Sequence, residues 1–115
     1  MDNLNGMIEL TADNFEDVIN KGVVLVDFYG NNCASCRGQE LILESVFEKM
    51  AGKVRFARIE AKKYLTLAGG KYNIKSLPTI IIFKNGTEKI RFAGLIGEEP
   101  LITELNKANI IEINR

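Results

Sequence analysis

Hydrophobic and polar positions alternate along the chain with the period of a strand in some segments and of a helix in others. Residues 23–30 (VVLVDFYG) are almost continuously apolar, which favours a central strand that is buried on both faces. Residues 36–52 carry apolar side chains at helical spacing and stop at a glycine, so the longest helix is expected there. Its predicted apolar face consists of Leu41, Ile42, Val46, Phe47 and Met50.

The remaining segments continue this alternation of helices and strands. Residues 11–20 predict a short helix that opens at Thr11 or Asp13 and ends at Gly22. Further predicted elements are a strand at 53–61, a weaker helix at 63–74 interrupted by Gly69–Gly70, a hairpin at 79–94 turning at Asn85–Gly86, and a helix at 98–109 with Pro100 in its first turn. This order indicates an α/β fold with a central mixed β-sheet flanked by helices.

Composition narrows the class of protein. With 115 residues and 46% hydrophobic content, the chain is expected to form one domain, residues 1–115. Fifteen basic residues balance fifteen acidic ones, so neither nucleic acid nor a membrane surface is an expected partner. The first ten residues lack the pattern of a signal peptide, and no segment is apolar enough to cross a bilayer. A cytoplasmic location is therefore expected.

The candidate chemistry lies in the two cysteines, Cys33 and Cys36. The chain has no histidine, which excludes imidazole chemistry and mixed Cys–His metal sites in the isolated chain. Cys33 follows the predicted central strand and precedes the long helix, where free backbone amides and the helix dipole favour a thiolate. Cys36 lies one turn later, within disulfide reach. This arrangement is typical of thiol–disulfide exchange.

Two other interpretations of the cysteine pair stay open at this point. The cysteines could be small buried hydrophobic residues that fall three positions apart by chance. They could also bind a metal, but two thiolates supply only half of a zinc ligand set. A zinc ion or an iron–sulfur cluster would therefore need a dimer that shares two cysteine pairs.

Three separate motifs, in the right order, resemble the thioredoxin family. The segment VVLVDFYGNNCASC (23–36) resembles the strand and active-site segment of that family, and SLPTIIIFKNG (76–86) is similar to its proline loop and hairpin. Gly94 lies where the family has a glycine. The likeness covers nearly the whole chain, from about Ile8 to about Ala108, and it implies the thioredoxin fold.

The resemblance also implies roles for residues around the cysteine pair. Cys33 would be the nucleophile and Cys36 the resolving thiol. Pro78, after Leu77, would be a cis-proline whose loop lies against the cysteines and lets the backbone pair with an extended substrate segment. Without the resemblance a trans peptide bond would be expected, because few X-Pro bonds in folded proteins are cis.

Asp27 and Arg58 complete the expected catalytic residues. Asp27 would be a buried acid that takes and returns the proton of the resolving thiol, and an acid within VVLVDFYG is costly unless it is paired or protonated. Arg58 stands where the family usually has a lysine, and its permanent charge is expected to hold Asp27 ionised more firmly. Alternatively, Asp27 could be a carboxylate that faces water at the end of the strand, and Arg58 could be a solvated charge on its strand.

Three departures from the family pattern affect recognition and redox behaviour. Asn32 stands in place of a tryptophan, Ala34–Ser35 in place of Gly–Pro, and Leu41 in place of a proline that kinks the helix, so a straighter helix is expected. These changes are compatible with exchange chemistry but alter the surface offered to a partner. The expected substrate-binding residues are Asn32, Ala34, Ser35, Leu77, Pro78 and Gly94.

These observations predict a thiol–disulfide oxidoreductase that reduces or exchanges disulfides in protein partners and uses no bound cofactor. Its catalytic residues would be Cys33, Cys36, Asp27 and Arg58. A monomer is expected, with an unidentified reductase as its electron donor. The alternatives are a binding module on the same fold with weak redox activity, and a dimeric iron–sulfur carrier.

Overall fold

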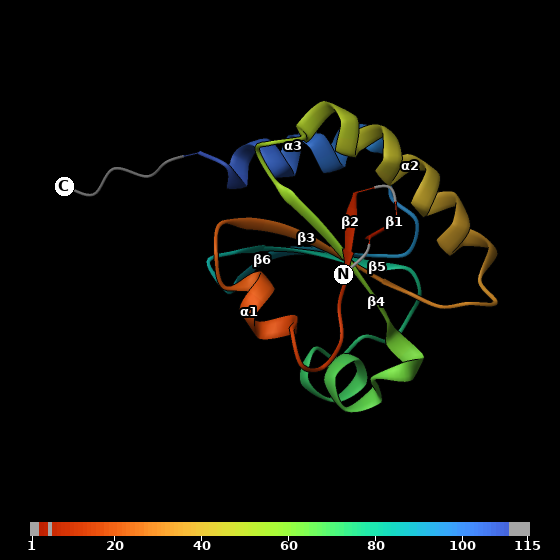
Figure 1. Ribbon diagram of the computed structural model, residues 1–115. Coiled ribbons are helices and arrows are strands. Elements are labelled where there is room, and N and C mark those ends of the chain that lie inside the picture. The colour runs from red at the N-terminus through yellow and green to blue at the C-terminus, as the bar shows by residue number, and fades with distance from the viewer. Residues whose placement is uncertain (1–2, 5, 111–115) are drawn as a thin grey trace.

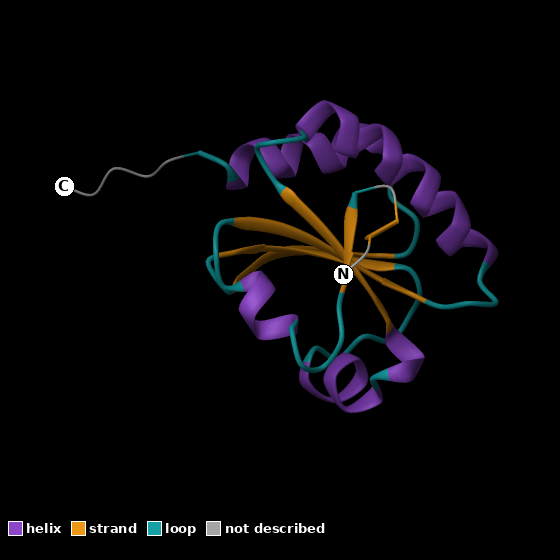
Figure 2. Cartoon of the chain, in the orientation of Figure 1, coloured by secondary structure: helices purple, strands orange, loops and turns teal. Residues whose placement is uncertain are grey.

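The computed structural model describes residues 3–4 and 6–110, and its strands form a six-stranded sheet with helices on both faces (Figures 1 and 2). The predicted α/β fold with a central mixed sheet is confirmed. The predicted domain boundaries, 1 and 115, lie outside the described residues. The elements are β1 (Asn3–Leu4), β2 (Met7–Glu9), α1 (Phe15–Ile19), β3 (Val23–Tyr29), α2 (Ala34–Met50), β4 (Arg55–Glu60), η1 (Ala61–Lys63), η2 (Thr66–Lys71), β5 (Thr79–Lys84), β6 (Thr87–Ala93) and α3 (Glu98–Ala108).

β3 is the central strand, as its apolar sequence predicts. The sheet order is β1-β2-β4-β3-β5-β6, with β4 parallel to β3 and β5 antiparallel to it. Six of the seven residues of β3 are buried, because helices cover both of its faces. The chain leaves β3 at Tyr29 and enters α2 at Ala34, so Cys33 lies at the carboxyl end of the central strand.

The helices divide between the two faces of the sheet (Figure 2). α2 and α3 cover one face and bury Leu43 and Leu105 against Leu25 and other sheet residues. α1 and η2 lie over the other face, where Phe15 and Phe28 belong to a second core. Among the described helices, none has the length and apolar character needed to cross a bilayer.

The predicted hairpin joins β5 to β6 and turns at Asn85–Gly86. Both turn residues have positive φ, 50° and 86°, which is the conformation that a tight two-residue hairpin requires. The turn is also tied to the chain between α1 and β3. The Gly22 amide donates a hydrogen bond of 2.8 Å to Asn85 Oδ1, and the Gly86 amide donates one of 2.9 Å to the Ile19 carbonyl.

Several details differ from the sequence-based predictions. The edge strand β1 and its neighbour β2 were not predicted, since two- and three-residue strands are too short to show a periodic pattern. Within the weaker helix predicted at 63–74, the helical residues form a π-helical segment, η2, that contains the two glycines. The 3₁₀ turn η1 precedes it and begins at the last residue of the strand predicted at 53–61.

The apolar face of α2 also differs from the prediction. Leu41 does not belong to it, because its side chain is 67% exposed, whereas the α2 residues that are buried follow a stripe of three- and four-residue steps. Those residues are Cys36, Gln39, Leu43, Val46 and Met50. The prediction that the first helix opens at Thr11 or Asp13 is wrong, because α1 begins at Phe15 with Asn14 as its N-cap residue. Thr11 instead shapes the preceding turn, where its Oγ1 accepts hydrogen bonds from the amides of Asp13 and Asn14.

Candidate active site

Cys33 is the N-cap residue of α2, the position that the sequence predicts. Its backbone is extended, with φ −144° and ψ 100°, and its Sγ accepts a hydrogen bond of 3.2 Å from the Cys36 amide. Cys33 and Cys36 form a disulfide with a Cα–Cα distance of 5.2 Å. Cys36 is only 5% exposed, whereas Cys33 is half-buried. Cys33 is therefore the cysteine that is more accessible to a partner.

The residues around Cys33 form an exposed rim. Asn32, Ala34 and Ser35 all face solvent. Ser35 Oγ lies 3.7 Å from Cys33 Sγ, so its hydroxyl is a candidate partner for a thiolate. The backbone hydrogen bond to the same sulfur comes from the Cys36 amide. The side-chain amide of Asn31, which precedes this rim, is held by Glu60 Oε2 at 2.6 Å.

The proline loop lies beside Cys33. The Leu77–Pro78 peptide bond is cis, as the resemblance implies. The Gly94 amide donates a hydrogen bond of 2.7 Å to the Pro78 carbonyl, and the φ of Gly94 is 93°, a conformation that favours glycine. Gly30 makes the approach of this loop possible. A Cβ at Gly30 would lie 2.9 Å from Leu77 Cδ1 and 3.9 Å from Cys33 Cβ.

Gln39 fixes the segment that follows Gly94, and sequence reasoning missed it. Its side chain is fully buried, its Nε2 donates a hydrogen bond of 3.0 Å to the Ile96 carbonyl, and its Oε1 accepts one of 2.9 Å from the Ile96 amide. Both bonds join α2 to the loop between β6 and α3. The feature that could have identified Gln39 from the sequence is its position on the apolar stripe of α2, because burial of a polar side chain is costly unless its polar atoms are hydrogen-bonded.

Asp27 is buried beneath the disulfide. Its side chain is 3% exposed, and its Oδ1 has no hydrogen-bond partner among the described residues. It lines a cavity of about 210 Å³ together with Cys36, Glu40 and Arg58, among others. Burial raises the pKa of Asp27 from 3.8 to about 7, since Arg58 lowers this pKa by less than burial raises it, and Glu40 and Glu9 raise it slightly further.

Arg58 favours the ionised form of Asp27, in the expected direction, but burial changes the pKa of Asp27 by more in the opposite direction. Near neutral pH a carboxyl group with a pKa of about 7 exchanges readily between its two protonation states. The interpretation of Asp27 as a carboxylate facing water does not agree with its burial. Its role in proton transfer stays a prediction.

Arg58 is held by three side chains that come from different elements. Its guanidinium carbon lies 3.9 Å from the centre of the Tyr29 ring, its Nη1 lies 3.3 Å from Glu40 Oε2, and its Nε lies 3.6 Å from Glu9 Oε1. Tyr29 donates a hydrogen bond of 2.8 Å to Glu9 Oε2. Burial and this bond raise the pKa of the Tyr29 hydroxyl. We call Glu9, Tyr29, Glu40 and Arg58 the Arg58 cluster.

The Arg58 cluster excludes the interpretation of Arg58 as a solvated strand charge, because the side chain is only 13% exposed. Sequence reasoning identified neither Glu9 nor Glu40. They meet Arg58 only through the pairing of β2 with β4 and the packing of α2 on the sheet, so no local pattern marks them.

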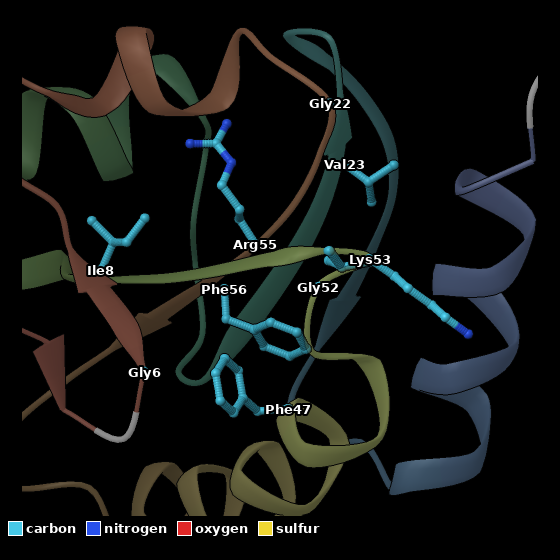
Figure 3. A pocket seen from close by; sticks show the side chains of 10 residues that line it. Gly6, Ile8, Gly22, Val23, Phe47, Gly52, Lys53, Arg55 and Phe56 are labelled. Atoms are coloured by element: carbon cyan, nitrogen blue, oxygen red, sulfur yellow. The ribbon is translucent and has the colours of Figure 1, made fainter.

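A larger cavity of about 360 Å³ lies at the opposite end of β3 and β4, away from the cysteines (Figure 3). Its wall includes Phe47 and Phe56, which pack edge to face with ring centres 5.4 Å apart. Arg55 also lines it, and the Arg55 guanidinium donates hydrogen bonds to the carbonyls of Val18 and Lys21. Within the described ranges, no group of three or more His, Cys, Asp or Glu side chains is arranged to hold a metal ion.

The fold and the site together define a class of protein with a Cys-x-x-C pair at a helix N-terminus and a cis-proline loop on a mixed sheet. The family model named Thioredoxin matches residues 6–107, and the chain belongs to the thioredoxin family. The expectation drawn from the three sequence motifs is thereby confirmed.

Curated relatives come from plants and bacteria. The chain is 38% identical over 100 residues to the chloroplastic thioredoxin Y of Oryza sativa subsp. japonica, covering 85% of this chain and 59% of the rice protein. It is 33% identical over 98 residues to a thioredoxin of Chlamydia caviae, covering 85% of this chain and 94% of that one. The chain thus spans about three fifths of the length of the plant relatives it matches and nearly all of the bacterial protein.

A solved structure with the same fold is that of chloroplastic thioredoxin z, described as defining a novel type-specific target recognition. The TM-score is 0.79 at 22% identity, and the match covers 89% of this chain and 93% of the other. At this identity the likeness supports the fold alone.

Proposed function

We propose that the protein is a thiol–disulfide oxidoreductase that reduces or exchanges disulfides in protein partners. The observation that carries this proposal is the placement of Cys33 as the half-buried N-cap of α2, with buried Cys36 in disulfide contact. The helix N-terminus stabilises a thiolate at Cys33, and the thiolate is the form that attacks a disulfide. Family membership and the cis-proline loop beside the pair support the same chemistry.

The reaction transfers two electrons from the dithiol to the partner. The Cys33 thiolate attacks one sulfur of the partner disulfide, so the partner S–S bond breaks, a mixed disulfide forms and the first partner thiolate leaves and takes up a proton. Cys36 then loses its proton to the Asp27 carboxylate and attacks Cys33 Sγ. The second partner thiolate leaves and takes up a proton, Asp27 releases the proton that it received, and the protein is left with the Cys33–Cys36 disulfide. A reductase that supplies two electrons and two protons restores the dithiol.

The substrate surface is the rim around Cys33. It comprises Asn32, Ala34 and Ser35, together with Leu77, Pro78 and Gly94, which lie on the proline loop and at the end of β6. Leu95 adds to this surface, since it follows Gly94 and is 55% exposed, and a Cβ added at Gly38 on α2 would lie 3.9 Å from Leu95 Cδ1. We place the activity in the cytoplasm, in a monomer without a bound cofactor.

The test compares the wild type with its two cysteine variants in reduction of a protein disulfide, with a small dithiol as the electron source. The wild type should accelerate reduction well beyond the dithiol alone, and Cys33→Ser should abolish the acceleration. Cys36→Ser should accumulate mixed disulfides with partners, because attack still occurs and resolution cannot. A wild type no faster than the dithiol alone would indicate a binding module on the same fold. Faster alkylation of Cys36 than of Cys33 at neutral pH would reverse the assigned roles.

A further inference from the structure

The Arg58 cluster stands at the wall of the cavity that contains Asp27 and Cys36. Glu40 and Arg58 line this cavity with them, as does Tyr29. Arg58 is the cation that acts on Asp27, yet its ion pairs are with two other carboxylates, those of Glu40 and Glu9. Within residues 3–4 and 6–110, Asp27 Oδ1 is a buried side-chain oxygen without a hydrogen-bond partner. A guanidinium is therefore close to an unpaired buried carboxyl group but directed toward two others.

The geometry of Arg58 explains why it keeps this orientation. Its planar fork presents separate donors, and Nη1 and Nε each face a different glutamate. The Tyr29 ring supports the flat face of the guanidinium, and the Tyr29 hydroxyl in turn holds Glu9. With an exposed side-chain fraction of 13%, Arg58 is partly desolvated, so these contacts hold it more firmly than they would on an open surface.

We propose that Glu40 and Glu9 are positioning residues that hold Arg58 away from Asp27, so that Asp27 remains free to accept and release the proton of Cys36. Arg58 would otherwise pair with the nearest carboxyl group that lacks a partner. This inference rests on the proposed function for its consequence, because Asp27 needs a proton only if Cys36 resolves a mixed disulfide. The positioning itself does not depend on turnover.

Release of Arg58 toward Asp27 would stabilise the carboxylate form of that acid. An arginine paired with an aspartate lowers the pKa of the acid by about one to three pH units. A carboxylate with such a low pKa is a weaker base toward the Cys36 thiol, since a general base works best when its pKa lies near the working pH. The charged and titratable groups facing Asp27 are Glu9 on β2, Tyr29 on β3, Arg58 on β4, and Cys36, Arg37 and Glu40 on α2.

The decisive experiment follows the carboxyl signal of Asp27 by NMR titration of the oxidised protein. Glu40→Asp is the informative variant, because it keeps the charge on α2 but shortens the side chain by one methylene group. If Glu40 acts through Arg58, the pKa of Asp27 should fall by about one pH unit in Glu40→Asp. A pKa within the error of the wild type would overturn the proposal, since it would mean that only the charge of Glu40 matters.

A second arm measures whether the effect passes through Arg58. Glu40→Gln should lower the pKa of Asp27 at least about twice as much in the wild type as in an Arg58→Gln background, where only the direct loss of charge remains. Equal shifts in the two backgrounds would also overturn the proposal. Glu48→Gln is the matched control, because it removes an exposed charge from the same helix outside the cavity. This substitution should leave the pKa of Asp27 unchanged.

The functional arm measures resolution of a preformed mixed disulfide with a model peptide across pH. The midpoint of the pH–rate profile should follow the pKa of Asp27. In Glu40→Asp this midpoint should move to lower pH by about one unit, and the maximal rate of resolution at high pH should be lower. A wild type that does not resolve the mixed disulfide would reject the proposed function but leave the NMR result valid. A pH–rate profile like that of the wild type in Glu40→Asp, despite a lowered pKa of Asp27, would show that Asp27 does not accept the proton of Cys36. That result would overturn the proposed role of the Arg58 cluster.

Discussion

The hydroxyl of Ser35 is within hydrogen-bonding reach of the attacking sulfur, at 3.7 Å from Cys33 Sγ. A hydrogen bond to a charged group contributes about 1.5–3 kcal/mol, and half of such a bond corresponds to roughly 15–30 mV in a two-electron couple. Because the thiolate exists only in the reduced protein, Ser35→Pro should raise the pKa of Cys33 and lower the reduction potential. Thiol titration and equilibration with glutathione measure both quantities.

Ser35→Ala is the matched control for this prediction. It removes the hydroxyl but keeps the backbone amide that proline lacks. The two variants should behave alike if the hydroxyl is the group that stabilises the thiolate, as its contact with the sulfur suggests. An unchanged pKa and potential in Ser35→Pro would show that this residue does not set the redox properties of the pair.

Asp27 makes the stability of the protein depend on pH. Its pKa is 3.8 in the unfolded reference and about 7 in the fold, so between these values the folded chain holds a proton that the unfolded chain has released. The free energy of unfolding therefore falls as the pH rises through this range. The fall should amount to about 2–3 kcal/mol between about pH 5 and about pH 7 and should level off above that.

Asp27→Asn provides the comparison, because an amide does not titrate. Denaturant unfolding of the oxidised proteins at several pH values should show the fall in the wild type and a smaller slope in the variant. Parallel pH curves for the two proteins would mean that Asp27 titrates alike in the folded and unfolded chains. The slope is the relevant quantity, since the substitution can also change stability at every pH.

Among the elements, the contact between α2 and the loop after β6 depends on Gln39. Gln39→Ala would leave the amide and carbonyl of Ile96 without their partners, at a cost of about 2 kcal/mol or more. The same change should free the segment that carries Gly94 and raise the KM for a protein disulfide more than it changes kcat. Unfolding curves and steady-state kinetics measure the two effects.

Leu41→Ala is the control on the same helix. Its side chain is 67% exposed, so its removal should change the free energy of unfolding by less than about 0.5 kcal/mol. A Gln39→Ala variant as stable as Leu41→Ala would show that water replaces the lost hydrogen bonds without cost.

The elements that the sequence predicts well are those specified by local pattern. The central strand β3, the long helix α2 and the hairpin at Asn85–Gly86 each carry their signal within a few residues. The features that were missed depend on contacts between distant segments. β2 joins the central part of the sheet only through its pairing with the distant strand β4, and the side chain of Gln39 forms its hydrogen bonds with a residue 57 positions away.

The candidate site shows the same division between local and distant signals. Cys33 and Cys36 follow from their place between a strand and a helix, and Pro78 from resemblance to a family motif. The protonation of Asp27 could not be predicted, because it depends on desolvation and on the direction in which Arg58 points. Both depend on the packing of α2 over the sheet, which brings Glu40 to Arg58.

For the whole molecule, the two cores on opposite faces of the sheet should unfold together. Ile81 and Ile82 are adjacent on β5 and fully buried, but they belong to different cores because side chains alternate along a strand. Ile81→Val and Ile82→Val should each lower the free energy of unfolding by about 0.5–1.5 kcal/mol. Both should shift the same transition, as expected for one domain. Calorimetry that resolved two transitions, each moved by one variant, would contradict a single cooperative unit.

The cavity beneath the disulfide and the rim above it have different walls. The cavity is lined by Asp27, Cys36, Glu40 and Arg58, among others, and none of the rim residues lines it. The disulfide between Cys36, which lines the cavity, and Cys33, which the rim surrounds, connects the two surfaces. Partner choice and proton handling can therefore diverge independently in this fold. A duplicated copy of the gene could change its partners through substitutions at the rim while the acid–base machinery beneath stayed the same.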